Sequence, residues 1–400
     1  MTDALIGRLW DGRTDRGVVR LEWDGDGIVA VAEEAGASTA EPGLSIIPGL
    51  IDTHVHLGSH ARGAAADPMT WPLVTPAAER SLHIAANALA CARGGVTTVR
   101  DLAADGVQMA VARAFDEGVL AGPRVRTHGQ VGMTAGHGDL FVPPRYPHRD
   151  PVADSPDECR KLVRTWAREG ADGVKIYTSG GVLSMGDKVG WRNQTREEIR
   201  TTVDEAHALS MLVAAHTHTA EGVDIALEEG VDSIEHGTGI EERHWEVLLE
   251  RNLPVAPTLL INDLIAQGHG GVPEEARRKA REVIEVRDRQ FAGAGRAGVR
   301  FVLGTDASGR FVGFGDQMAE VRLMAETFGW SAERALASAT SDAADAIGLG
   351  DTVGTIAPGF GADFVVVRGR PWQRIDELRR EGIVAVVSRG RVLHGELPRA

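Results

Sequence analysis

Short apolar runs rich in β-branched residues alternate with longer segments of helical spacing through the middle of the chain. Each of the following runs fits a buried strand: LSIIPGLIDTHVHL, VTTVRDL, RVRTHG, GVKIYT, LVAAHTH, DSIEHG, LPVAPTLL and VRFVLGTD. The segments between them, such as 157–170, repeat apolar positions every three or four residues. Strand–helix alternation repeated eight times favours an α/β fold of the closed (β/α)8 TIM-barrel type over an open sheet.

The same region contains residues that are typical of the starts and ends of helices. Ser155 before Pro156 fits an N-cap followed by proline in the first turn, and Thr195 with Glu198 fits a capping box. Glycine follows many of the helical segments, namely at Gly94, Gly118, Gly170, Gly230 and Gly298. These residues mark where the predicted helices begin and end.

The two ends of the chain follow another pattern. Both alternate short apolar runs with Asp-Gly or Arg-Gly pairs, which favour β-hairpins. We therefore expect one small, discontinuous β-domain from residues 1–48 plus 350–400. It would lie beside a catalytic barrel of residues 49–349.

Three long, glycine-rich connections follow predicted strands, at residues 130–154, 178–194 and 261–273. The loops that follow the strands of a barrel lie at its carboxyl face, where active sites are found. We expect these three segments to cover such a site.

Composition narrows the class of protein. The chain has 400 residues, of which 43% are hydrophobic and 25% charged, as in ordinary globular proteins with a large core. A net charge of −14 argues against a nucleic-acid or anionic-membrane partner, because both need a basic face. Cys91 and Cys159 form no CxxC pair, which argues against a disulfide scaffold or a cysteine zinc site. No signal-peptide pattern or membrane-length apolar run is visible, so we expect a cytoplasmic protein.

Histidines and one aspartate lie at the ends of several predicted strands. His54 and His56 are two residues apart in an extended segment, so both imidazoles point to the same side. His216, His236 and Asp306 end three later strands. Since such ends meet at the mouth of a barrel, these side chains converge there. Imidazole and carboxylate without thiolate suit Zn²⁺ or a similar divalent cation.

Lys175 ends the fourth predicted strand and would point into the same mouth. An ammonium would be repelled by nearby metal ions, whereas a neutral amine or a carbamate formed with carbon dioxide would be accepted. A carbamate resembles a carboxylate and can bridge two metals. A salt-bridged lysine, or one that reaches solvent, is the alternative, and the sequence leaves both open.

Several motifs, in family order and spread over nearly the whole chain, resemble those of the metal-dependent amidohydrolase superfamily. They are PGLIDTHVHLG, GGVTTVRDLA, GADGVKIYTSGGVLS, VAAHTHTAEGVDIALEEGVDSIEHGT, FVLGTDAS and GTIAPGFGADFVVV. More narrowly, the chain resembles the branch of binuclear-zinc, prolidase-like dipeptidases and carboxypeptidases, near ochratoxin- and phenylurea-hydrolysing enzymes. The resemblance implies that the terminal β-domain is a β-sandwich. It also implies a small-molecule substrate and a homo-oligomer.

The resemblance also implies a role for each site residue. Two divalent metal ions, taken as Zn²⁺, would be held by His54, His56, Lys175, His216, His236 and Asp306. Lys175 would be carbamylated and bridge the metals, and Asp306 would also carry a proton. His137, in TAGHGD, looks like the family's lid histidine that contacts substrate, and His218 faces the same side as His216. With Arg310 they are candidates for binding the carboxylate of a leaving amino acid; structural histidines are the alternative.

These groups predict hydrolysis. A hydroxide held between two metals is available near neutral pH, because bound water is acidified to a pKa of roughly 7. It would attack a carbonyl, while Asp306 delivers the proton that a leaving nitrogen needs. We expect cleavage of the C–N amide bond of a dipeptide-like or N-acyl amino-acid substrate. The alternative from the same centre is hydrolysis of xenobiotic or secondary-metabolite amides, carbamates, phenylureas or esters, including ochratoxin-like substrates.

One departure from the family pattern bears on the substrate. After GTDAS the dipeptidase branch commonly shows a His-Gly element, whereas this chain reads GRFVGFGDQMAEV. Phe311 and Phe314 would make the rim apolar and favour aromatic groups, unless they only pack the loop. A non-catalytic scaffold is a third hypothesis, but it predicts missing ligands and all six positions are filled.

Overall fold

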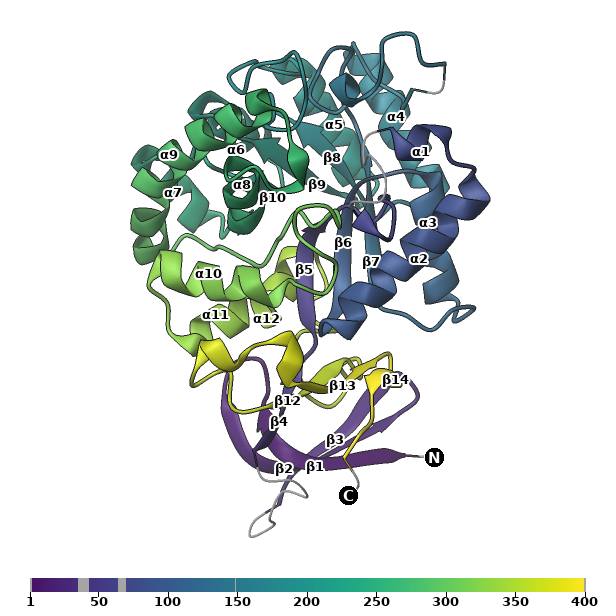
Figure 1. The fold of residues 1–400 in the computed structure, drawn as a ribbon, viewed down its shortest axis with the longest axis vertical. Helices are drawn as coiled ribbons and strands as arrows, with labels where there is room; N and C mark the ends of the chain where they lie inside the picture. The colour runs from purple at the N-terminus through teal and green to yellow at the C-terminus, as the bar shows by residue number, and fades with distance from the viewer. Residues whose placement is uncertain (1, 35–42, 64–69, 148, 399–400) are drawn as a thin grey trace.

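The computed structural model describes residues 2–34, 43–63, 70–147 and 149–398. Within them the strands form two sheets of seven strands each. One sheet curls into a barrel surrounded by helices, and the other lies below it together with both termini (Figure 1). The (β/α)8 barrel with a small terminal β-domain is therefore confirmed.

The barrel strands are parallel neighbours in chain order. They are β5 (Leu50–Val55), β6 (Val96–Ala104), β7 (Arg124–Gln130), β8 (Gly173–Tyr177), β9 (Leu212–Thr217), β10 (Ser233–His236) and β11 (Val255–Ala256). The expected eighth strand is not a regular strand. Residues 301–307 close the ring through two single bridges, Val255 to Phe301 and Val55 to Ala307. The Asp306 amide also donates to the His54 carbonyl at 2.8 Å, which places Asp306 beside the end of β5.

Two further predicted strands differ from the observed ones. The run LSIIPGLIDTHVHL is two strands, β4 (Leu44–Pro48) and β5, in different sheets. They separate at Gly49, where a Cβ atom would lie 2.0 Å from Thr97 Oγ1, so only glycine lets the chain pass so close to β6. The run LPVAPTLL gives only the two residues of β11, because a helix begins at Leu259. The buried Glu320 carboxylate accepts the Leu259 and Leu260 amides at 2.6 and 2.8 Å and thereby caps that helix.

The helices surround the barrel or connect its strands. They are α1 (Trp71–Val74), α2 (Ala77–Arg93), α3 (Gly106–Asp116), α4 (Pro156–Glu169), α5 (Arg196–Ala208), α6 (Ala220–Glu229), α7 (Glu242–Glu250), α8 (Leu259–Ala266), α9 (Glu274–Ala297), α10 (Met318–Phe328), α11 (Ala332–Ser338) and α12 (Ser341–Ala346), with short 3-10 turns η2 (Asp139–Phe141), η3 (His269–Gly271), η4 (Ile375–Glu377) and η5 (Arg380–Gly382). The Ser155 cap and the Thr195 capping box are both present. Gly170, Gly230 and Gly298 end their helices in the left-handed conformation, as expected.

The terminal β-domain joins the two ends of the chain in one mixed sheet. Its order is β14 (Arg391–Gly395), β13 (Ile383–Ser388), β12 (Phe364–Arg368), β4, β1 (Asp3–Trp10), β2 (Asp15–Asp24) and β3 (Gly27–Glu33). Strand β4 unites the halves, because it pairs parallel to β1 and antiparallel to β12. Arg389 and Gly390 have φ of 51° and 69° in the β13–β14 hairpin, so this Arg-Gly turn is confirmed.

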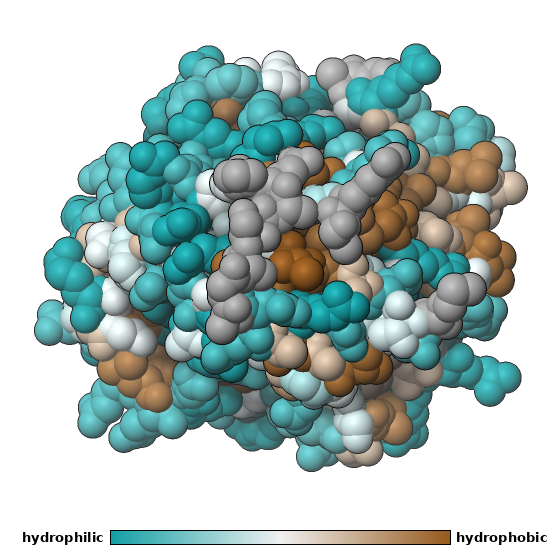
Figure 2. All heavy atoms as spheres, turned by 90° about the horizontal axis from the view of Figure 1, so that it is seen from below, coloured by the Kyte–Doolittle hydropathy of each residue, from teal (hydrophilic) through white to brown (hydrophobic). Residues whose placement is uncertain are grey.

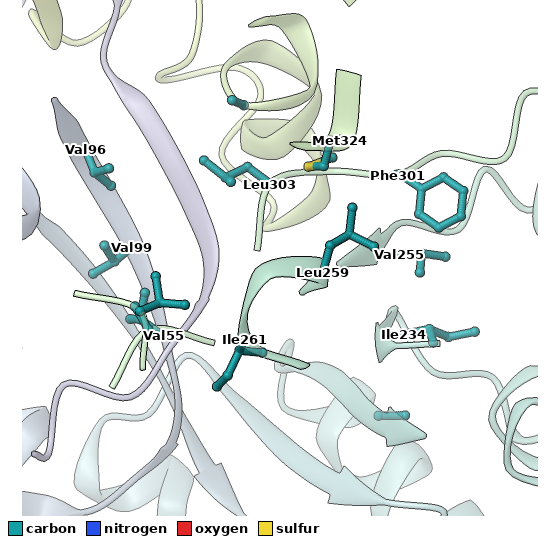
Figure 3. Close-up of a cluster of buried hydrophobic side chains, with 14 of the residues drawn as sticks. Val55, Val96, Val99, Ile234, Val255, Leu259, Ile261, Phe301, Leu303 and Met324 are labelled. Carbon is teal, nitrogen blue, oxygen red and sulfur yellow. The ribbon is translucent and has the colours of Figure 1, made fainter. Parts of the chain in front are cut away.

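Apolar packing holds each part together. In the barrel, Val96 and Val99 of β6 lie on one side of a buried cluster and Phe301 on the other, with Leu303 between them (Figure 3). A separate cluster fills the β-domain, where the Trp23 and Phe364 rings meet edge to face at 5.1 Å. Viewed from the β-domain end, the surface is mainly hydrophilic with apolar residues in small groups (Figure 2). Among the described residues, no helix has both the length and the apolar character needed to span a membrane.

Candidate metal centre and substrate cavity

A cavity of about 380 Å³ opens at the carboxyl ends of the barrel strands. Most residues that the sequence singles out line it: His54, His56, His137, Lys175, His216, His218, His236 and Asp306. They come from β5, β8, β9, β10, segment 301–307 and the connections after β5, β7 and β9. The barrel thus brings together side chains that are up to about 250 residues apart in the sequence.

The first group of potential metal ligands is His54, His56 and Asp306, whose donor atoms all lie within 4.8 Å of one another. Asp306 Oδ1 is 3.5 Å from His54 Nε2 and 3.0 Å from His56 Nε2. Asp306 has a φ of 55°, an uncommon backbone conformation that turns its carboxylate towards β5. The three donors therefore face a common point.

Both imidazoles of this group are fixed from behind. His56 Nδ1 lies 2.8 Å from the Leu102 carbonyl, and His54 Nδ1 lies 2.9 Å from the Glu235 carboxylate. Glu235 is itself held by Arg100 at 2.6 Å and by Ser233 at 2.7 Å, all out of contact with solvent. Since carbonyls and carboxylates accept, a proton on each Nδ1 fits these contacts, and it would leave each Nε2 to face Asp306 or a metal. We did not predict this support from the sequence; the available signal was a carboxylate and a guanidinium within apolar strands.

The second group is His216, His218 and His236, whose donor atoms also lie within 4.8 Å of one another. The His236 and His218 rings bond through Nδ1 to Thr258 at 2.7 Å and to Thr238 at 3.0 Å. The His216 ring bonds through Nε2 to the Gly180 carbonyl at 3.2 Å, so it presents Nδ1 to the centre. The sequence assigns a ligand role to His216 and His236 and a substrate role to His218, whereas the distances between the donor atoms do not separate His218 from the other two.

Lys175 lines the same cavity as both groups. Its side chain is buried, and Nζ has no hydrogen-bond partner among the described residues. Burial lowers the pKa of this amine to about 8, although Glu235 and Asp306 favour the charged form. An unpartnered buried amine with an increased neutral fraction is suited to react with carbon dioxide. The donor set, with this amine beside it, fits a pair of divalent cations.

The electrostatics keep most of the potential ligands in the state that binds metal. His56 is the exception, because burial alone would lower its pKa but the neighbouring Asp306 carboxylate raises the pKa above the usual value. Burial, followed by the charge of Lys175, lowers the pKa of His54 to about 4. Burial likewise holds the pKa of His216 and His236 well below the usual value. Burial alone would raise the pKa of Asp306, but the His54 and His56 rings bring it below its usual value. Neutral imidazoles and an ionised carboxylate are the ligand forms that metals require.

The proposed substrate residues are placed differently from one another. The His137 ring stacks on His216 with centroids 4.3 Å apart, at the cavity wall. Arg310 is not among the residues that line the cavity, and its Nε donates to the Gly270 carbonyl at 2.9 Å. Within the described part of the chain, the guanidinium that lines the cavity belongs to Arg80 of α2, which pairs with Asp105. Nothing in the sequence distinguishes Arg80 from a surface arginine of an amphipathic helix.

One wall of the cavity is apolar. It is formed by Pro72, Leu73, Phe141, Val142, Val182, Leu183, Ile261 and Ile265. Phe311 and Phe314 do not line the cavity in the described structure. Phe314 is 9% exposed and belongs to the core, and Phe311 packs beside Gly270, so both serve loop packing. The apolar wall comes instead from α1, α8 and the connections after β7 and β8.

Known proteins are similar to this chain in both sequence and fold. The model of the amidohydrolase family matches residues 45–393. Ochratoxinase from Aspergillus niger is 29% identical over 365 residues, which cover 86% of this chain and 74% of that protein. The crystal structure of a Xaa-Pro dipeptidase with methionine in its active site is 30% identical, with a TM-score of 0.87 over 98% of this chain and 99% of the other. A prolidase complexed with N-methylphosphonate-L-proline is 29% identical, with a TM-score of 0.86 over 99% of this chain and 100% of the other.

Proposed function

The chain belongs to the amidohydrolase family and is an enzyme acting on C–N amide bonds, and we propose that its substrate is dipeptide-like or an N-acyl amino acid. The observation that carries the proposal is the pair of three-residue donor groups with the unpartnered Lys175 amine beside them. The similarity to a dipeptidase and a prolidase supports the peptide-like substrate.

We assign the metal ligands as the sequence predicts them. His54, His56, His216, His236, Asp306 and a carbamylated Lys175 would hold two divalent cations, with Zn²⁺ the ion that such a donor set suits. When bound, such a pair supplies Lewis acidity, which acidifies water and polarises the scissile carbonyl. Glu235 and the Leu102 carbonyl keep the histidine nitrogens aimed at the centre.

Asp306 is the proposed proton carrier. Its carboxylate is ionised, lies at the cavity wall and has His56 Nε2 at 3.0 Å. It can therefore take a proton from the attacking water and release it to the nitrogen of the breaking bond. Without this proton an amine is a poor leaving group, so this step distinguishes amide hydrolysis from hydrolysis of activated esters.

The cavity wall suggests how the rest of the substrate binds. Arg80 offers a guanidinium that can pair with the carboxylate of an amino-acid product, a role for which Arg310 is poorly placed. The apolar wall around Phe141, Ile261 and Ile265 would take an apolar side chain or acyl group. A volume of about 380 Å³ suits a small molecule rather than a folded polypeptide.

The apolar wall also favours a second candidate function. Ochratoxinase is among the similar proteins, and a large apolar substrate would use the same wall. Xenobiotic or secondary-metabolite amides, carbamates, phenylureas and esters therefore remain substrates to test beside the dipeptides.

The purified enzyme should be assayed against Xaa-Pro, Xaa-Arg and aromatic dipeptides, N-acyl amino acids, aryl amides, phenylureas and aryl esters, with metal content measured in the same preparation. We expect bound divalent metal, loss of turnover on chelation and the highest kcat/KM for amides that release a free amino acid. Higher kcat/KM for phenylureas or esters would favour the second candidate. Turnover in a metal-free preparation would contradict the metal centre itself.

A further inference from the structure

A buried chain of polar side chains ends on His137, outside the proposed metal ligands. Lys279 of α9 donates from Nζ to Asp187 Oδ1 at 2.6 Å and to the Ser184 carbonyl at 2.8 Å. Ser184 Oγ lies 2.7 Å from Asp187 Oδ2 and 2.8 Å from His137 Nδ1. The side chains of Lys279 and Asp187 are each 2% exposed, and Ser184 is fully buried. Hydrogen bonds through Asp187 and Ser184 therefore connect a lysine of an outer helix to a histidine at the cavity wall.

The hydrogen bonds between these four side chains fix where each proton lies. Burial would raise the pKa of Asp187, but hydrogen bonds from Lys279 and Ser184 bring it below the usual value, so Asp187 is a carboxylate that only accepts. The Ser184 hydroxyl must then donate to Asp187, which leaves its oxygen as an acceptor for His137. His137 Nδ1 consequently carries the proton, and Nε2 carries a lone pair.

The His137 ring has little freedom to turn away. It is 8% exposed and stacks on His216 at an interplanar angle of 25°. Its main-chain amide donates to Asn193 Oδ1 at 2.7 Å, which ties the loop after β7 to the loop after β8. Gly181 leaves the space that the ring fills, since a Cβ there would lie 1.8 Å from His137 Cε1. No hydrogen bond from a described residue reaches Nε2, so this atom is available to a molecule in the cavity.

We propose that Lys279, Asp187 and Ser184 are positioning residues that hold His137 in its Nδ1–H form, so that Nε2 accepts a hydrogen bond from the substrate. The matching group is a donor, such as the N–H of a secondary amide or the departing amine. This role rests on the proposed function, which supplies the amide substrate that would occupy the cavity. It assigns the substrate carboxylate to Arg80, because an outward lone pair on His137 repels an anion.

The state of His137 can be observed without any substrate. Histidine-selective ¹⁵N labelling of the metal-loaded full chain, with a His137→Gln variant for assignment, reports which ring nitrogen carries the proton. We expect protonated Nδ1 and unprotonated Nε2 in the wild type, and a change of this pattern in Ser184→Ala. Ser338→Ala should leave it unchanged, because Ser338 is also fully buried and its hydroxyl donates to the Ala335 carbonyl of its own helix. A wild-type His137 protonated at Nε2, or a Ser184→Ala spectrum like the wild type, overturns the proposal.

Kinetics give a second readout. Ser184→Ala and Asp187→Ala should lower kcat/KM for a secondary amide about 5- to 30-fold at unchanged metal content, the range for loss of a well-placed hydrogen bond. Ser338→Ala should stay near wild type. Equal kcat/KM in Ser184→Ala and Ser338→Ala contradicts the positioning role. Absence of amide turnover in the wild type contradicts the proposed function, whereas the ¹⁵N result still decides the state of His137.

Discussion

Each histidine of the centre uses one nitrogen for the protein and keeps the other for the cavity. His56 bonds outward to a backbone carbonyl and His236 to Thr258, and His54 Nδ1 lies 2.9 Å from the buried Glu235 carboxylate. Outward bonds of this kind set the tautomer and ring angle before a metal arrives, so less conformational freedom is lost on binding. The chemistry of the proposed centre would therefore depend on residues that do not themselves bind a metal.

Lys175 provides the most direct test of the centre at this scale. Lys175→Ala removes the buried amine proposed to bridge the cations, so we expect reduced metal content. The kcat/KM should fall by more than the roughly 10- to 100-fold that loss of an outer partner of a ligand costs. Lys161→Ala, on the exposed face of α4, is the control and should behave as the wild type. Full metal content and activity in Lys175→Ala would exclude the bridging role.

Asp306→Asn separates proton transfer from metal binding. An amide side chain cannot carry the proton, so kcat for an amide substrate should fall about 10²- to 10⁴-fold. An ester with a stable leaving anion should lose much less, because its leaving group needs no proton. Metal analysis of the same preparation is the control. Equal losses on both substrates would limit Asp306 to holding a metal.

At the scale of elements, the barrel strands supply the potential ligands and the connections supply the wall that meets substrate. Most of the potential ligands lie in or directly after β5, β8, β9 and β10, where backbone hydrogen bonds to neighbouring strands fix their positions. His137, Phe141 and Leu183 belong instead to connections without long regular elements. Loops can change without disturbing the barrel, so the loops rather than the strands set the substrate.

Two glycines of one connection allow a matched test of this division. Gly181→Ala would place a Cβ 1.8 Å from His137 Cε1, whereas Gly190→Ala meets no atom within 4 Å. We expect Gly181→Ala to lower kcat/KM by up to about 100-fold, because a displacement of ~1 Å can cost that much. Metal content should stay unchanged, since no strand moves. Wild-type kinetics for Gly181→Ala, or a loss as large for Gly190→Ala, would contradict the close fit of His137 against this loop.

At the scale of the whole molecule, a metal pair would also join parts of the barrel. Segment 301–307 closes the ring without forming a regular strand, through backbone hydrogen bonds to β5 and β11, and it carries Asp306 across to the potential ligands of β5. A cation held by both would add to these contacts.

Metal removal should therefore lower the stability of the folded protein. At a free metal concentration of roughly 100 times its Kd, a bound ion contributes about 2.7 kcal/mol to the free energy of unfolding. We expect the thermal midpoint to fall on dialysis against a chelator and to recover when Zn²⁺ is restored, as followed by calorimetry. The Lys175→Ala variant should show a smaller shift than the wild type. An identical midpoint with and without metal would exclude this structural contribution.

The sequence by itself determined the features that depend on residues close together along the chain. Two-residue spacing in a strand put His54 and His56 on one side, strand–helix alternation gave the barrel, and Asp-Gly and Arg-Gly pairs gave the terminal hairpins. The residues that line the cavity at strand ends followed from the same rules. Their roles as ligands, like the domain boundaries near residues 48 and 350, stay predictions.

Tertiary structure decided what depends on contacts between distant segments. Gly49 splits an apparently continuous strand because β6 passes beside it, and Glu320 starts a helix where the sequence favours a strand. Arg80 rather than Arg310 lines the cavity. Lys279 is connected to His137 through Asp187, and Lys279 and Asp187 are 92 residues apart in the sequence. The residues next to a side chain in the sequence do not indicate which distant residues it will contact. Burial and hydrogen bonding between remote segments are set only when the barrel closes, and for that reason the wall of the site could not be derived from the chain alone.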